Sequence, residues 1–104
     1  SEKFNFIYGE FDYYMSVSGF IVSLVKSNEL EYSKQIIDKI EDLLIRRVSV
    51  FSNLDEDEQI FYIEGITSDI NNYSKIINSI ELFNSELYDN YKKNLDELLN
   101  NIVE

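Results

Sequence analysis

The residues of this 104-residue sequence that are best able to perform chemistry are its carboxylates. There is no His, no Cys and no Trp, while 20 Asp and Glu stand against nine Lys and Arg. Thiol nucleophiles, disulfides, zinc fingers, His-assisted serine hydrolases and His-ligated di-iron bundles all need side chains that the sequence lacks. Most familiar enzyme chemistries are therefore excluded.

The first candidate metal site is the acidic run at residues 55–59, DEDEQ, which is similar to the opening of a calcium loop. Such a loop needs Gly at its sixth position and Glu at its twelfth, but counting from Asp55 these positions hold Ile60 and Ile66. Calcium binding there is therefore excluded. The same acids suit the positive end of a helix dipole, so we interpret the run as a helix N-terminus.

Carboxylates at helical spacing could also bind magnesium, as in all-helical nucleotide pyrophosphatases. Glu86 and Asp89 form one i, i+3 pair, and Asp38, Glu41 and Asp42 form another group. No doubled-glutamate motif accompanies them, and hard cations need a convergent cage of oxygens rather than neighbouring acids. We expect no metal, no cofactor and no enzymatic activity, with a carboxylate-magnesium nucleotide hydrolase as a remote alternative.

A candidate recognition surface follows the segment after the acidic run. At about 100° per residue, six positions fall within about 80° of one another on a helix. They alternate acids with tyrosines around one glycine: Asp55, Glu58, Tyr62, Gly65, Asp69 and Tyr73. Tyr is favoured at recognition surfaces, and acids pair with Lys or Arg of a partner. The structural alternative is that both tyrosines fill the edge of the core while the acids are solvated.

The charge predicts the kind of partner. The net charge is −11, and it is unevenly distributed, since residues 1–52 carry eight acids and six bases whereas residues 53–104 carry twelve acids and three bases. Phosphate backbones and anionic membranes would repel such a protein. We expect a basic protein partner, no direct nucleic acid and no membrane contact.

Localisation is predicted by what the sequence lacks. The opening residues have no basic start or cleavage site of a signal peptide, and the longest uncharged run, residues 13–25, is shorter than the roughly 20 apolar residues of a membrane span. The absence of Cys fits a reducing compartment. We expect a cytoplasmic protein.

Apolar residues recurring at steps of three and four predict an all-α fold: one domain over residues 1–104, an antiparallel bundle of about four helices. The expected helices cover residues 10–26, 29–52, 56–79 and 83–103, and residues 4–8 are either extended or helical. In the expected helix over residues 29–52, the apolar residues that share one face are Ile36, Ile37, Ile40, Leu43, Leu44, Val48 and Phe51. In the expected helix over residues 56–79, the apolar residues that share one face are Ile60, Ile63, Ile66, Ile70, Tyr73, Ile77 and, just after its end, Ile80.

Local signals refine the helix ends. Asn28 with Glu31, and Asp55 with Glu58, have the spacing of capping boxes and predict two N-termini. A kink or fray is expected at residues 71–72, and the pair at 46–47, Arg-Arg, is expected to neutralise a helix C-terminus. Gly65 is expected to allow close helix packing opposite Gly19, or else to open a cleft for a partner side chain.

The segments at residues 40–44, 55–59 and 61–66, IEDLL, DEDEQ and FYIEGI, resemble the central part of small acidic all-helical immunity proteins associated with bacterial polymorphic toxins. The resemblance covers about residues 36–72. It implies a non-catalytic inhibitor that binds one cognate toxin in the cytoplasm. No binding residue can be transferred, because the shared pattern is structural.

The function expected from these observations is a non-catalytic protein-binding domain, an immunity protein or antagonist that occludes a basic surface of a toxin or nuclease domain. Two alternatives stay open. A phage-type inhibitor that mimics DNA would need acids at phosphate-like intervals on one face, and a helical subunit of a larger assembly would bury an exposed apolar stripe. The oligomeric state is not predicted.

Overall fold

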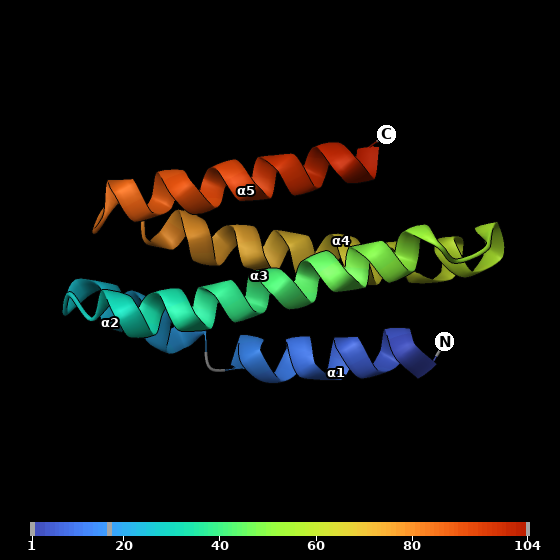
Figure 1. Cartoon of the computed structure of the whole chain (residues 1–104), viewed down its shortest axis with the longest axis horizontal. Helices are drawn as coiled ribbons and strands as arrows, with labels where there is room; N and C mark the ends of the chain where they lie inside the picture. The colour runs from blue at the N-terminus through green and yellow to red at the C-terminus, as the bar shows by residue number, and fades with distance from the viewer. Residues whose placement is uncertain (1, 17, 104) are drawn as a thin grey trace.

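The central element of the computed structural model is α3 (Leu30–Ser52), which packs against every other helix (Figure 1). The structure describes residues 2–16 and 18–103, and side-chain surroundings for residues 9–16 and 18–100. These residues form five helices, the others being α1 (Glu2–Ser16), α2 (Gly19–Lys26), α4 (Glu56–Ser79) and α5 (Ser85–Val103). In Figure 1, α1 and α5 lie on opposite sides of α3, and the start of α1 and the end of α5 are at the same end of the bundle. The predicted all-α, antiparallel single domain is confirmed.

The expected helix over residues 10–26 is two helices. Near the end of α1 the hydroxyl of Ser16 donates to the carbonyl of Tyr13 at 2.5 Å, and that of Ser18 donates to the carbonyl of Met15 at 2.6 Å. Serine side chains that bond to the backbone in this way compete with a continuing helix. Gly19 therefore begins α2 instead of interrupting a longer helix, and residues 4–8 belong to α1.

Asn28 ends a helix, so the prediction that it starts one is wrong. Its φ of 61° lies in the left-handed region that Asn tolerates better than most residues. Its N–H donates to the carbonyl of Val25 at 3.0 Å, and the N–H of Glu29 donates to that of Leu24 at 2.8 Å. This pair of bonds is a Schellman motif closing α2, and Glu29 takes the N-cap position of α3 without a side-chain cap.

The predicted start of α4 is confirmed, because the carboxylate of Asp55 accepts a hydrogen bond from the N–H of Glu58 at 2.9 Å. Asn84 does the same for α5, accepting from the N–H of Leu87 at 2.9 Å, so α5 begins two residues later than expected. Between these caps α4 continues through Asn71 and Asn72 without the expected break.

The core lies where the apolar faces of all five helices meet. The predicted stripe of α3 is confirmed, with Ile36 half-buried and the rest buried. The core members are Phe11, Ile21, Val25, Ile37, Ile40, Leu43, Leu44, Val48, Phe51, Ile66, Ile70, Tyr73, Ile77, Ile80, Leu87, Tyr91, Leu95 and Leu98. Among the described residues, no helix is long and apolar enough to cross a membrane.

Candidate functional site

The predicted recognition stripe runs from the surface into the core. Asp55 and Gly65 are exposed, and Glu58 and Tyr62 are half-buried. Tyr62 packs against the core, and its ring meets the edge of Phe61 with centroids 4.9 Å apart. Asp69 and Tyr73 are buried. The two ends of the stripe therefore have different surroundings, and the buried end holds α4 against α3.

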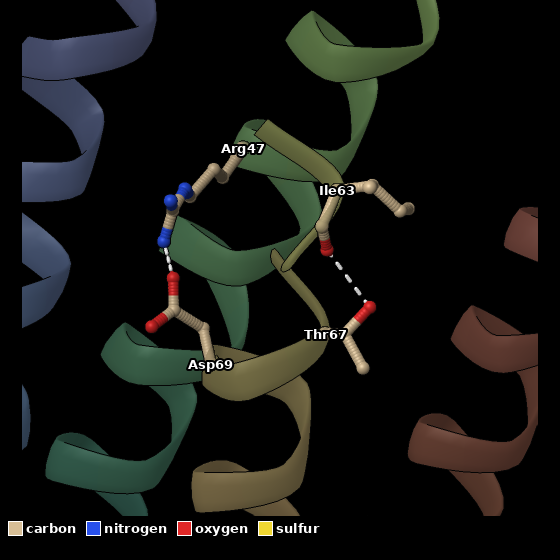
Figure 2. Close-up of polar contacts among 4 residues, drawn as sticks. All are labelled: Arg47, Ile63, Thr67 and Asp69. Atoms are coloured by element: carbon tan, nitrogen blue, oxygen red, sulfur yellow. Dashed lines mark hydrogen bonds and ion pairs between the residues drawn. The ribbon is translucent and has the colours of Figure 1, made fainter. Parts of the chain in front are cut away.

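Asp69 forms a buried ion pair with Arg47 of α3 (Figure 2). The expectation that Arg46 and Arg47 neutralise a helix C-terminus is wrong, because α3 has no base in its last turn. Arg47 is only 3% exposed, and Arg46 forms an exposed pair with Asp42 at 3.0 Å. Two desolvated charges need each other, because removing one leaves the other buried without its counter-charge. The pair therefore joins α3 to α4 in the interior of the bundle.

Gly65 lies beside the same guanidinium. A Cβ built on Gly65 would be 3.4 Å from Nη2 of Arg47, while one built on Gly19 would have no neighbour within 4 Å. The expected packing of Gly65 opposite Gly19 is thus wrong. Gly65 instead adjoins the buried guanidinium of Arg47.

Two tyrosines join α4 and α5 to acids of α3. Tyr73 donates to Oε2 of Glu41 at 3.0 Å, and Tyr91 of α5 donates to Oδ1 of Asp38 at 2.5 Å. Asn94 also donates to Glu41 at 3.3 Å. Burial, followed by interaction with the neighbouring carboxylates, raises the pKa of both tyrosines. Both hydroxyls therefore stay protonated and act as donors.

These bonds involve one of the two groups of acids considered for magnesium, the group on α3, while Glu86 and Asp89 of α5 are exposed. Asp38 and Glu41 accept from tyrosines, and Asp42 pairs with Arg46. Burial is the main cause that raises the pKa of Glu41, with hydrogen bonds from Tyr73 and Asn94 opposing it. Across the described residues no three acidic side chains are grouped so that they could hold a metal ion. The local arrangement serves helix packing.

The outward face of α4 begins with a cluster of exposed apolar side chains. Ile60 is 68% exposed, Phe61 78% and Ile63 38%, so the expectation that Ile60 and Ile63 belong to the core is wrong. The buried residues of α4 span about 100° of the helix, and Ile60 and Phe61 lie about 80° beyond its two edges. No rotation of α4 could bury both of them together with Tyr73 and Ile77. Ile60 and Ile63 therefore lie toward one edge of the outward face and Phe61 toward the other, and we call the three residues together the α4 apolar cluster.

Acids surround this cluster. Residues 55–58 are all acidic, Glu64 follows one turn after Ile60, and the next base along the chain is Lys75. The side chains of Asp55, Glu56, Asp57 and Glu64 are exposed. Exposed apolar groups beside charges of one sign mark an interaction surface more clearly than either feature alone.

A hollow of about 410 Å³ continues from the cluster along α4. Its lining residues form two neighbouring i, i+4 rows on the outward face: Ile63, Thr67, Asn71 and Lys75, and Glu64, Ser68 and Asn72. Figure 2 shows Ile63 and Thr67 on the other side of α4 from the Arg47–Asp69 pair, with the Thr67 hydroxyl donating to the Ile63 carbonyl at 2.8 Å. We call this surface the α4 groove.

The sequence held a signal for the cluster that periodicity alone missed. Residues 60–63 are four consecutive large apolar residues, Ile-Phe-Tyr-Ile, within a helix. Four successive positions cover about 300°, more than one packed face can bury. At least one of the four had to face solvent or a partner.

Comparison with known proteins does not assign the chain to a family. No protein-family model matches it, and neither a curated protein nor a solved structure matches it significantly. The sequence and the structure together establish an all-α helical bundle.

Proposed function

We propose that this chain is a non-catalytic protein-binding domain that inhibits a basic partner by covering part of its surface. The single observation that carries the proposal is the α4 apolar cluster, three large exposed side chains between the acids at 55–58 and Glu64. The resemblance to small acidic immunity proteins supports a partner such as a toxin or nuclease domain. The cytoplasm, where such a partner would have to be neutralised, is part of the same proposal.

The cluster supplies the short-range affinity in this proposal. Burying a fully exposed Ile or Phe side chain stabilises a complex by about 1.5–3 kcal/mol. Affinity in protein interfaces is concentrated in a few such residues near the centre of the contact. Phe61, the most exposed of the three, is the expected anchor.

The acids supply the long-range attraction. A net charge of −11, with five acids and no base from residue 53 to residue 68, gives a strong negative field around the start of α4. Such a field speeds encounter with a basic protein and weakens as salt screens it. Among the residues predicted from the sequence, Asp55, Glu58, Tyr62 and Gly65 lie next to this cluster along α4. Asp69 and Tyr73 are buried farther along the same helix.

The two alternative functions predict different binding partners for this protein. An inhibitor that mimics DNA would occupy the DNA-binding site of its target, and a subunit of an assembly would bury the apolar cluster permanently. The α4 apolar cluster favours the protein antagonist over a DNA mimic. DNA presents regularly spaced phosphates, so a protein that mimics it would present regularly spaced acids and not exposed Ile and Phe side chains.

The proposal can be tested by photo-crosslinking. A photoreactive phenylalanine analogue placed at residue 61 should trap a basic protein in cells that produce the chain. Phe20 of α2 is the matched control, because it is 66% exposed and lies on another helix. Trapping the same partner equally from both positions, or a partner without basic character, would contradict the proposal.

A further inference from the structure

The α4 groove has the shape that one helix presents to another. Its two walls are i, i+4 rows, headed by Ile63 and Glu64, and ridges of this kind pack between the rows of a second helix. The middle of the groove is formed by the short side chains of Thr67 and Ser68, which let another backbone approach. From Ile60 to Lys75 the face is about 22 Å long, or about four turns of a helix.

The outward face of α4 has no helical partner within the described chain. Every residue that lines the groove is exposed: Ile63, Glu64, Thr67, Ser68, Asn71, Asn72 and Lys75. This side of α4 is therefore available to a helix supplied by another protein.

The charges along the α4 groove predict which kind of helix it can bind. Residues 55–58 and Glu64 make one end acidic, the middle is neutral at Asn71 and Asn72, and Lys75 makes the other end basic. A second copy of this chain would bring the same acids and the same net charge of −11, so self-association on this face is opposed. The complementary partner has bases at one end, apolar residues at helical spacing beside them, and an acid toward the other end.

We propose that the α4 groove binds an amphipathic α-helix of the partner protein, with the basic end of that helix beside residues 55–58 and Glu64 and its apolar stripe on the α4 apolar cluster. This inference rests on the proposed function and specifies the element of the partner that is recognised. Recognition by a helix laid in a groove depends on anchors at three- and four-residue spacing, which Ile60, Ile63 and Thr67 provide on α4.

The experiment uses the full chain and a synthetic alanine-based peptide of about 18 residues, long enough to cover the groove as a helix. The peptide has leucines at helical spacing, lysines near one end and glutamates near the other. A second peptide of equal length and charge has the same leucines, lysines and glutamates, but prolines replace central alanines so that it cannot form a helix. Binding is followed by titration of backbone amide NMR resonances.

The helical peptide is expected to shift the resonances of residues 60–75 and to bind at least about tenfold more tightly than the proline peptide. Ser68→Trp fills the groove and should weaken binding at least about tenfold, whereas Ser49→Trp, on the exposed side of α3, should leave it unchanged. Equal affinities for the two peptides, shifts confined to other helices, or a Ser68→Trp variant that binds normally would overturn the inference.

The two proposals can fail separately. If a partner trapped through residue 61 is bound normally by Ser68→Trp but lost by Phe61→Ser, the helix-in-groove inference is wrong and the proposed function stands. If Phe61→Ser and Phe20→Ser bind the trapped partner alike, the proposed function itself is wrong. Far-UV circular dichroism of each variant shows that the helices are intact.

Discussion

The Tyr73 hydroxyl on α4 donates to the Glu41 carboxylate on α3 at 3.0 Å, although the two residues are 32 positions apart in the sequence. Tyr73 is fully buried and Glu41 is half-buried, so the bond lies where the core meets the surface. A tyrosine of this kind contributes its ring to the core and its hydroxyl to a neighbouring helix. The residue therefore belongs to the packing of α3 and α4.

Removing this hydroxyl tests its contribution to stability. Tyr73→Phe keeps the ring and removes the bond to Glu41, and we expect the free energy of unfolding to fall by about 1.5–3 kcal/mol, the range for hydrogen bonds to charged groups. Urea denaturation measures the change. Tyr13→Phe, at a ring that is 65% exposed, is the control and should have little effect. Equal effects of the two substitutions would show that the bond contributes nothing.

The raised pKa of Glu41 predicts a pH dependence. Because burial raises the pKa in the folded state above the usual 4.5, the folded protein binds the proton more tightly than the unfolded chain. The contribution of Glu41 to stability is therefore fully present below pH 4.5 and is lost as the pH rises through the folded-state pKa. As the pH falls from 7 to below 4.5, wild type should gain stability relative to Glu41→Gln.

The control for this measurement is Asp89→Asn, which removes the same charge from an exposed site on α5. Lower net charge at acid pH reduces repulsion in every variant, so the informative quantity is the difference in unfolding free energy between wild type and each variant. If the difference for Glu41→Gln is flat with pH, or runs in the opposite direction, the burial of Glu41 does not control its titration.

The buried pair of Arg47 and Asp69 should behave differently from the exposed pair of Arg46 and Asp42. Arg47→Met leaves the Asp69 charge buried without its counter-charge, and we expect a loss of about 3–5 kcal/mol. Arg46→Met should cost less than about 1 kcal/mol. The double variant Arg47→Met/Asp69→Leu should be more stable than Arg47→Met, as measured by urea denaturation. Similar losses at positions 46 and 47 would contradict the buried pair.

Gly65→Ala tests the surroundings of the glycine next to Arg47. The new Cβ would be 3.4 Å from Nη2 of Arg47, an ordinary van der Waals contact, and Ala favours a helix over Gly by about 1 kcal/mol. We expect a rise in thermal stability. Gly9→Ala in α1, where a Cβ would have nothing within 4 Å, should give a similar gain. A loss at Gly65 with a gain at Gly9 would mean that Arg47 needs the space.

The parts of the fold that follow local rules could be predicted from the sequence. The Asp55 cap and the apolar stripe of α3 depend on residues three or four positions apart, and the structure confirms both. Asn28 shows the limit of such rules, because the same side chain suits a helix start and a left-handed helix end. Whether Asn28 starts or ends a helix depends on how α2 and α3 pack against each other.

The candidate site was harder to predict than the fold. Ile60 and Ile63 fit the three- and four-residue spacing of the apolar residues of α4. That they are exposed follows from where the other helices pack against α4. Arg47 looked like a surface base, since its counter-charge at Asp69 lies 22 positions away on another helix. Burial is decided by tertiary packing, and a single sequence gives only the period of the pattern.

The central claim, recognition of a basic protein by the α4 apolar cluster and its acids, is tested most directly by the kinetics of binding to the partner trapped through residue 61. The association rate constant should fall as salt is raised from low to physiological concentration. At fixed salt, Phe61→Ser should raise the dissociation rate constant at least about tenfold, whereas Phe20→Ser should not. An association rate that is independent of salt, or equal dissociation rates for the two variants, would contradict the account.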